Sequence, residues 1–446
     1  MKKNLWIWAL AAFSMAACTS EDAPTPEQVV TENDFESPDG RIVVQLGAES
    51  TPAAAISRAP IEGDNITALT ELGIFAINRG AEISSGEYED WPDNINNCLL
   101  KNVKAAGTAN EPLDNGVNKG RRLTLFNTTA TESGYVYYYP IQGQQNYDFY
   151  GYHPRVGDND LSLDENGKIR VLMDLSSGDV DLITGKAAPA KTVFEDTLYV
   201  TEASETAAAT TGDSYIDGYN AKYVRKIKYH NWIIDQSQSL TNNKIDIKEK
   251  DPFIPNISFK HRLTKLNFQI ITAQEQAGEN APENDRDEAT ELRVSDIKLK
   301  NVCVTALLTI DNEIPILFEH GGTDVAMNKK TDGTSANIWK NETDIIPQEF
   351  NSQEYVSAGY VMVPPTNAEG IDYTNYPYKI ALKVKSTDSM GIPQTQDVEL
   401  DLKDYEFEAG KSYNIRIALY ALQKVHVSAE LTPWDEDTTP VYIPVE

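Results

Sequence analysis

The sequence has 446 residues, with 68 Asp and Glu against 39 Lys and Arg, so its formal net charge is −29. Nucleic acids and anionic membrane surfaces are bound through basic patches, so this acidic chain is not expected to bind either of them. At about 150 residues for a typical domain, the length is sufficient for two domains.

The N-terminus is organised like a bacterial lipoprotein signal peptide. Lys2 and Lys3 precede an apolar stretch at residues 5–13, which is much shorter than the roughly 20 residues of a membrane-spanning helix. Two alanines then lie directly before Cys18, as in a lipobox. We therefore predict that residues 1–17 are removed and that acyl chains on Cys18 anchor the protein, with each buried CH₂ contributing about 0.8 kcal/mol.

Residues 18–40 are rich in Pro, Glu, Asp and Thr. Such a segment has too little apolar surface to offset its ordering entropy, so we expect a flexible acidic tether. Its acidic pair, Glu21 and Asp22, resembles the signal that sends lipoproteins of Bacteroidetes to the outer face of the outer membrane. The predicted location is therefore the outer membrane at the cell surface.

Most of the remaining chain alternates between apolar and polar residues with a period of two, which is typical of half-buried strands. The clearest segments are residues 41–46, 161–163, 168–174, 263–271, 378–384 and 413–419. Residues 304–310 and 314–318 are separated by a turn at 311–312, and within residues 67–77, which have no clear period, we interpret residues 72–77 as a strand. Asn166 and Gly167 can take the positive φ of a hairpin turn. Because no long stretch has clean helical periodicity, the sequence predicts an all-β protein with two antiparallel β-sandwich domains in tandem.

A domain boundary is expected where a charged run gives way to prolines, near residues 248–255. The predicted domains are residues 59–250 and 251–446. Two long polar segments, residues 203–218 and 273–290, are expected to be surface insertions.

Few residues suggest chemistry. Apart from Cys18 the chain has only Cys98 and Cys303, which we expect to be free and partly buried, with a disulfide as the alternative. The five histidines are scattered, and no pair has the i, i+4 spacing of a helical metal site. Nucleophile-elbow, phosphate-loop and dinucleotide patterns are also missing. We therefore expect no enzymatic activity, no metal and no cofactor.

Tyrosines are concentrated at residues 135–139 and 147–152. Aromatic side chains on a sheet can fill a core and its edges through cross-strand pairs, or they can stack on sugars. The packing interpretation is favoured. The second interpretation gives an alternative function, a monomeric glycan-binding lipoprotein anchored in the outer membrane.

A resemblance to a known family extends over most of the chain. Residues 259–268, 407–415 and 425–431, followed by Pro433 and Trp434, resemble in order the second domain of fimbrillins, the type V pilus subunits and related lipoproteins of Bacteroidetes. Residues 181–187 and 359–365 fit the same pattern more loosely. The resemblance implies two transthyretin-like β-sandwich domains, lipoprotein export, cleavage after an arginine by a trypsin-like protease, and polymerisation by strand exchange.

The residues can be assigned roles within that scheme. Residues 41–58 would be a pro-strand and cleavage linker, cut between Arg58 and Ala59. The displaced strand would bury Ile42, Val44 and Leu46. A donor strand within residues 438–446 would supply three aliphatic side chains at the same spacing, namely Val441, Ile443 and Val445.

Pro444 would have to lie where no backbone donor is needed. The alternative is that both segments are permanent strands of an anchored monomer. The resemblance implies that the protein is a pilus subunit that serves adhesion. Its partners would be other fimbrillin subunits and a host protein or glycan.

Overall fold

The computed structural model describes residues 37, 40–50, 70–79, 98–114, 119–126, 134–140, 146–187, 218–221, 254–272, 292–311, 314–319, 321–329, 337–338, 348–349, 355–387, 390–421 and 424–432. Within these ranges the regular structure consists of strands, a 3₁₀ turn, η2 (Asp158–Asp160), and a single helical residue, Ala221. No helix of the described residues combines the length and the apolarity needed to cross a membrane. The predicted all-β fold class is confirmed.

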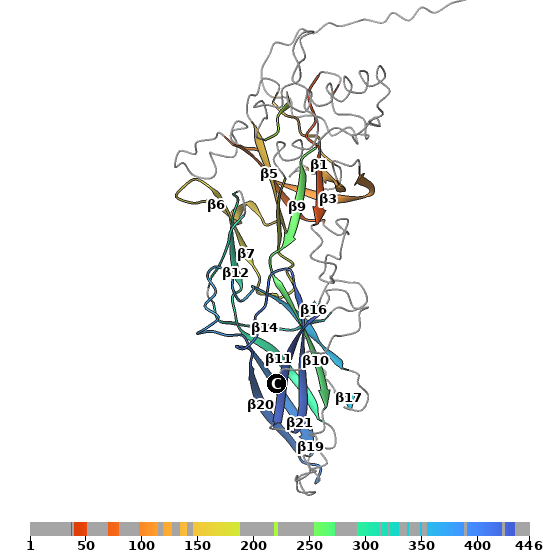
Figure 1. Ribbon diagram of the computed structural model, residues 1–446, viewed down its shortest axis with the longest axis vertical. Coiled ribbons are helices and arrows are strands. Elements are labelled where there is room, and N and C mark those ends of the chain that lie inside the picture. Colours follow the sequence, from red (N-terminus) through yellow and green to blue (C-terminus); the bar gives the residue numbers. More distant parts are fainter. Residues whose placement is uncertain are drawn as a thin grey trace, which may run out of the picture.

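The N-terminal half forms a sheet that closes on itself (Figure 1). All neighbouring strands are antiparallel except β1 and β9, whose parallel pairing completes the closure. In spatial order the strands are β1 (Leu46–Ser50), β4 (Lys119–Leu125), β3 (Cys98–Asp114), β2 (Leu72–Asn78), β5 (Tyr147–His153), β8 (Ile183–Ala187) and β9 (Asn256–His261).

The C-terminal half is a sandwich of two sheets around one apolar core. The larger sheet contains β16 (Asn337–Ile338), β15 (Asn328–Lys329), β18 (Val356–Val363), β10 (Thr264–Thr272), β21 (Ser412–Ala421) and β22 (Lys424–Thr432), with β17 (Gln348–Glu349) beside β10. The smaller sheet contains β14 (Thr323–Ala326), β11 (Arg293–Val302), β19 (Lys379–Thr387) and β20 (Pro393–Asp401). Strands β10 and β21 are parallel neighbours.

A third sheet joins the two halves. Its order is β13 (Ile316–Glu319), β12 (Thr305–Thr309), β7 (Ile169–Asp174) and β6 (Leu161–Leu163), so strands from both halves of the sequence pair along β7 and β12. The buried face of this sheet contributes to a separate apolar core together with Phe75 and Tyr360. We call β13-β12-β7-β6 the connecting sheet.

The local predictions agree with these elements. The strand predicted at residues 72–77 is β2, and those at 263–271 and 413–419 are β10 and β21. In the hairpin between β6 and β7, Asp164 Oδ1 accepts hydrogen bonds from the backbone N–H groups of Asn166 and Lys168, at 2.9 and 2.8 Å. Gly167 has the positive φ expected there, +72°.

Strand β9 begins after the boundary suggested near residue 250, yet it pairs with β8 and β1 of the N-terminal sheet. The chain passes from the N-terminal sheet to the C-terminal sandwich between β9 and β10. The insertions predicted at 203–218 and 273–290 lie almost entirely outside the described residues.

Gly185 in β8 permits the close approach of β9. A Cβ atom at this position would lie 2.4 Å from the backbone oxygen of Ser258, so a side chain would separate the two strands. The glycine of the 181–187 segment thus has a packing role in closing the N-terminal sheet.

Candidate functional site

The segment at residues 42–50 is held in the N-terminal sheet by backbone hydrogen bonds. The Val44 N–H donates to the Tyr137 oxygen at 2.8 Å, and the Tyr139 N–H donates to the Ile42 oxygen at 2.9 Å. Strand β1 then follows, with Leu46 opposite Leu123 of β4. The segment is therefore extended and bonded from Ile42 onward.

Alternate side chains of this segment enter the N-terminal core. Ile42, Val44 and Leu46 have exposed fractions of 2, 4 and 0%, and they belong to the same apolar cluster. The alternation continues to Ala48, which is also fully buried. The sequence interpretation ended the strand at residue 46 and missed Ala48, although the same i, i+2 spacing points to it.

The opposite face of the segment is covered as well. Val43 and Gln45 are buried, and the Gln45 side-chain oxygen accepts a hydrogen bond of 2.8 Å from Arg122 of β4. The Arg41 guanidinium lies over the ring of Tyr138, 4.1 Å from its centre. Residues 42–48 are thus enclosed on both faces.

Both edges of β1 are occupied, by β4 in antiparallel and by β9 in parallel orientation. A strand in this position cannot leave without exposing backbone donors and acceptors of two neighbours. Its departure would also uncover the apolar sites now filled by Ile42, Val44, Leu46 and Ala48. The arrangement is a strand-shaped groove filled by the N-terminal segment of the same chain.

Residues 235–434 match the model of the fimbrillin-like family. This part of the chain is fimbrillin-like. It contains β9, which flanks the N-terminal segment, and all strands of the C-terminal sandwich.

Several solved structures are similar to this chain. A fimbrial protein from Bacteroides vulgatus is 14% identical with a TM-score of 0.43, covering 88% of this chain and 99% of that protein. A candidate cell adhesion protein from Bacteroides uniformis is 13% identical with a TM-score of 0.41, covering 90% and 100%. The fimbrial anchor protein Mfa2 from Porphyromonas gingivalis is 8% identical with a TM-score of 0.27, covering 87% and 98%. A comparison with curated protein sequences gives no match.

The tyrosine-rich segments of the chain are mostly packed inside it. Tyr139, Tyr147 and Tyr152 are at most 2% exposed, and Tyr139 makes an edge-to-face contact with Phe149 at 6.3 Å between ring centres. Burial, with a smaller contribution from Tyr135, raises the pKa of Tyr137 to about 12. Tyr139 and Tyr147 fill the N-terminal core, whereas Tyr152 lies in the separate core beneath the connecting sheet. Both placements agree with the packing interpretation.

The thiols of Cys98 and Cys303 are free, as expected, and they are almost fully buried rather than partly buried. Burial raises the pKa of the Cys98 thiol to about 12, against smaller opposing effects from nearby backbone groups and Lys101. A thiol with so high a pKa is protonated at neutral pH and is a poor nucleophile.

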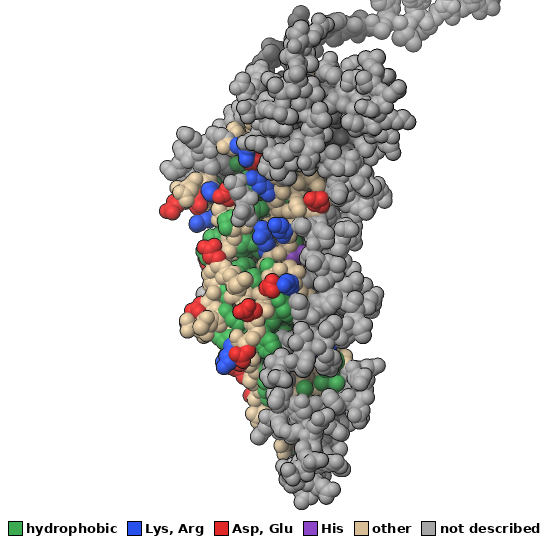
Figure 2. Space-filling view, in the orientation of Figure 1, with side chains coloured by type: hydrophobic (Ala, Val, Ile, Leu, Met, Phe, Trp, Pro, Cys, Tyr) green, Lys and Arg blue, Asp and Glu red, His purple; other side chains and the backbone are tan. Residues whose placement is uncertain are grey.

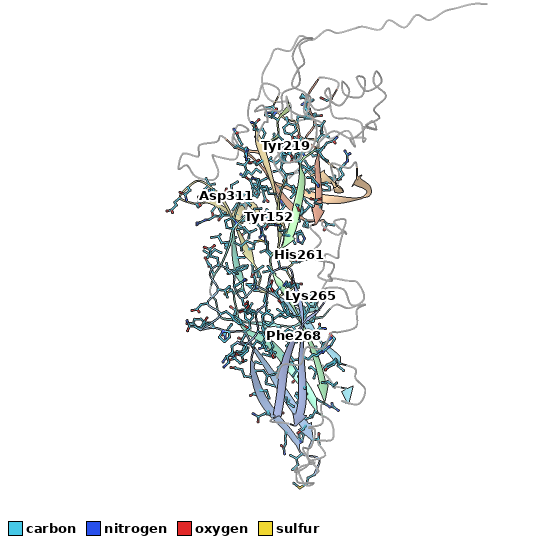
Figure 3. The ribbon with its side chains drawn as sticks, viewed as in Figure 1. Tyr152, Tyr219, His261, Lys265, Phe268 and Asp311 are labelled. Atoms are coloured by element: carbon cyan, nitrogen blue, oxygen red, sulfur yellow. The ribbon has the colours of Figure 1, made fainter. Side chains whose placement is uncertain are left out.

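Two histidines, His153 and His261, contact Asp181 near the junction of the two halves. His261 Nδ1 lies 2.9 Å from Asp181 Oδ1, and His153 Nδ1 lies 3.1 Å from the Asp181 backbone oxygen. Figure 3 shows His261 between Tyr152 of the N-terminal half and Lys265 of the C-terminal half. Burial lowers the pKa of His261, but the charge of Asp181 and the hydrogen bond to it raise the pKa above its usual value overall.

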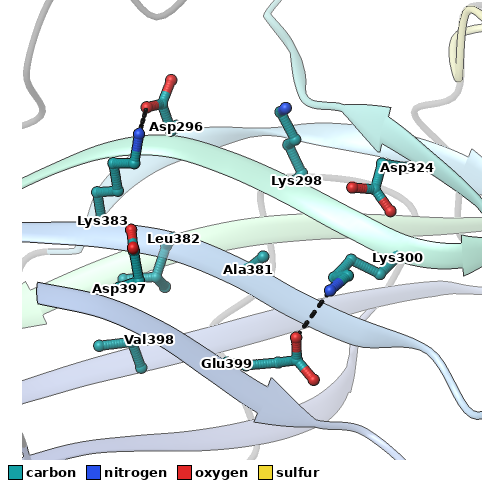
Figure 4. Close-up of a pocket in the computed structure, with 10 residues that line it drawn as sticks. All are labelled: Asp296, Lys298, Lys300, Asp324, Ala381, Leu382, Lys383, Asp397, Val398 and Glu399. Carbon is teal, nitrogen blue, oxygen red and sulfur yellow. Dashed lines mark hydrogen bonds and ion pairs between the residues drawn. The ribbon is translucent and has the colours of Figure 1, made fainter.

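A shallow hollow of about 370 Å³ lies on the charged face of the smaller C-terminal sheet (Figure 4). Its charged side chains largely pair with one another: Lys383 with Asp296 at 2.9 Å, and Lys300 with Glu399 at 2.8 Å. Such exposed pairs contribute little to stability. Within the described ranges no group of three or more His, Cys, Asp or Glu side chains is arranged to hold a metal.

Several residues named from the sequence lie outside the described residues. These are the lipidation residue Cys18, the cleavage pair Arg58 and Ala59, and the donor residues Val441, Ile443 and Val445. Their roles stay predictions. Of the named sets, only Ile42, Val44 and Leu46 are located in the structure.

Proposed function

We propose that this fimbrillin-like protein is a subunit of a surface fimbria that assembles by donor-strand exchange and serves adhesion. Its export as a Cys18-anchored lipoprotein to the outer membrane, and its release by cleavage at Arg58–Ala59, are parts of the same proposal. The family match supports a fimbrial or adhesion role. The observation that carries the assembly mechanism is the enclosed segment at residues 42–48.

The energy of that segment suits a displaceable strand. Burying an aliphatic side chain contributes about 1.5–3 kcal/mol, so Ile42, Val44 and Leu46 together contribute roughly 5–9 kcal/mol. A whole domain is stable by only about 5–15 kcal/mol. If cleavage released this strand, the N-terminal sheet would lose much of its folding free energy. A donor strand from another subunit would restore most of it by filling the same groove.

The C-terminal tail supplies a matching replacement. If Val441, Ile443 and Val445 of another subunit take the places of Ile42, Val44 and Leu46, then Pro444 takes the place of Gln45. Within the part of the chain that the structure describes, the Gln45 N–H donates no backbone hydrogen bond, so a proline there removes none from the ladder. A strand added in this way obtains affinity from backbone bonds and specificity from alternate side chains.

Limited trypsin digestion tests the proposal. Cleavage after Arg58 should convert the monomer into a ladder of oligomers that survives mild denaturant, because the groove opens only after the cut. Deletion of residues 438–446 should abolish the ladder without preventing the cut, and Arg58→Gln should prevent both. A cut protein that stays monomeric at high concentration would show that this chain does not polymerise by strand exchange.

A further inference from the structure

The outer face of the connecting sheet carries a row of leucines. Leu307 of β12 lies directly opposite Leu172 of β7 on one side and Leu317 of β13 on the other. Leu172 is 44% exposed and Leu317 is 40% exposed, and Leu307 is partly exposed. We call these three residues the leucine row. In Figure 2, hydrophobic side chains gather over the part of the molecule where β7 and β12 lie.

The leucine row is not part of the core beneath it. The inward residues of the same strands, Val171, Met173, Ala306, Leu308 and Phe318, are nearly fully buried and fill the core that joins the two halves. The leucines on the other face keep a large part of their apolar surface in contact with water, so folding stabilises them less than the inward residues. A contiguous apolar row on an otherwise charged protein is typical of a surface that contacts another molecule.

Charges of opposite sign flank the leucine row on its two sides. On one side, Arg170 lies two residues from Leu172 along β7 and is opposite Thr309 of β12. In the other direction lie Asp174 and Glu319, which flank Thr305. Among the described residues, Arg170, Asp174 and Glu319 form no ion pair with one another or with any other side chain. Hydrogen bonds from Ser176 lower the pKa of Asp174, so this carboxylate is charged at neutral pH.

This pattern is complementary to itself. We propose that the leucine row is a contact between two copies of this chain, packed face to face about a twofold axis that runs along the row. Such an axis places each leucine against the same leucine of the second copy and reverses the strand direction. Arg170 of each copy then faces Asp174 of the other, as an isologous interface requires.

The charges select this axis over the other simple choice. A twofold axis parallel to the strands would also stack the leucines, but it would place Asp174 and Glu319 against the acidic side of the second copy. Like charges brought together in a partly desolvated contact oppose association. Only the axis along the row brings opposite charges together on both sides.

The contact is small. Strands lie about 4.8 Å apart, so a row across three strands covers far less than the roughly 800 Å² per partner of a stable interface. Separate subunits should therefore associate weakly through the leucine row. Subunits that are linked in a polymer would associate strongly with a second polymer, because many such contacts form at once. The contact requires neither cleavage nor strand exchange. It can therefore form even if the chain does not polymerise, and it can be absent even if the chain does.

Sedimentation equilibrium of the uncut full chain carrying Cys18→Ser tests the contact. We expect weak self-association that Leu307→Asp weakens at least tenfold, while Met390→Asp, at another exposed apolar residue, leaves it unchanged. Arg170→Asp should weaken it and the double change Arg170→Asp with Asp174→Arg should restore it. Absence of association at millimolar concentration, or association unaffected by Leu307→Asp, would overturn the proposal.

Thiol cross-linking identifies the axis, because Cys98 and Cys303 are buried. With a short bismaleimide, Leu307→Cys should cross-link to itself, since this residue faces its own copy. Thr305→Cys alone should not, but a mixture of Thr305→Cys and Thr309→Cys chains should cross-link. Self-linking of Thr305→Cys at the same rate as Leu307→Cys would contradict the axis along the row.

Discussion

Asp181 links three strands of the N-terminal sheet through side-chain and backbone contacts. Its carboxylate binds His261 at the end of β9, and its backbone oxygen binds His153 at the end of β5. Asp181 itself lies two residues before β8 and is 1% exposed at its side chain. The carboxylate is thus buried and stabilised by its imidazole partner.

The raised pKa of His261 makes this link dependent on pH. A histidine whose folded pKa exceeds its unfolded value stabilises the protein below the unfolded pKa, about 6.5, and this stability is lost as the pH rises through the folded pKa. We expect Asp181→Asn to destabilise the protein by about 1.5–3 kcal/mol at pH 5.5, the size of a hydrogen bond to a charged group, and by less at pH 8.5.

Urea unfolding at the two pH values measures this difference, and an NMR titration of His261 measures the pKa directly. Glu165→Gln, at an exposed turn residue, is the control and should have no pH-dependent effect. An equal loss of stability at both pH values for Asp181→Asn would argue against a charged His261.

Among the elements, β1 differs from an ordinary first strand. Its parallel pairing with β9 joins residues that are about 200 positions apart in the sequence, for example Gly47 and Asn256. The closed sheet thus depends on the strand that comes first in the sequence among its members.

Truncation of a buried side chain in this segment should weaken the whole N-terminal sheet. We expect Leu46→Ala to cost about 2–5 kcal/mol, because Leu46 is fully buried and a cavity would replace part of its side chain. The midpoint of urea unfolding of the uncut protein measures the effect. Leu163→Ala, at a partly buried residue of β6, should cost less; equal effects would mean that the segment is not packed as a core strand.

For the whole molecule, the connecting sheet makes the two halves depend on each other. Strands β7 and β12 come from different halves and pair over five residues, from Thr305 with Asp174 to Thr309 with Arg170. Their inward side chains share one core. Unfolding of one half should therefore remove partners from the other.

A charge in this shared core should reveal that dependence. We expect Ala306→Asp, at a fully buried position, to lower the unfolding temperature of both halves, because an unpaired buried carboxylate is costly. Differential scanning calorimetry with fluorescence of each half measures this. The matched change Thr309→Asp, on the outer face of the same strand and opposite Arg170, should be tolerated. If Ala306→Asp lowers only one transition, the halves are energetically independent.

Much of the fold could be predicted from the sequence, because strand patterns and turn residues are local properties. The period of two at residues 413–419 predicted β21, the apolar run at residues 72–77 predicted β2, and Asn166-Gly167 predicted the hairpin. For the candidate site, the spacing of Ile42, Val44 and Leu46 was sufficient to predict one shared face. The spacing did not reveal that Val43 and Gln45 are buried too, since their cover comes from residues 134–140 and from β4.

By itself the sequence determined the all-β class and the positions of several strands, among them β7, β10 and β21, since these follow from the alternation of neighbouring residues. Only the tertiary structure decided which strands pair. It showed β1 enclosed between β4 and β9, His261 bound to Asp181, and Leu172, Leu307 and Leu317 aligned in one row. The physical reason is that pairing and register between strands far apart in the chain are set by how whole apolar faces pack together, and no local pattern records that.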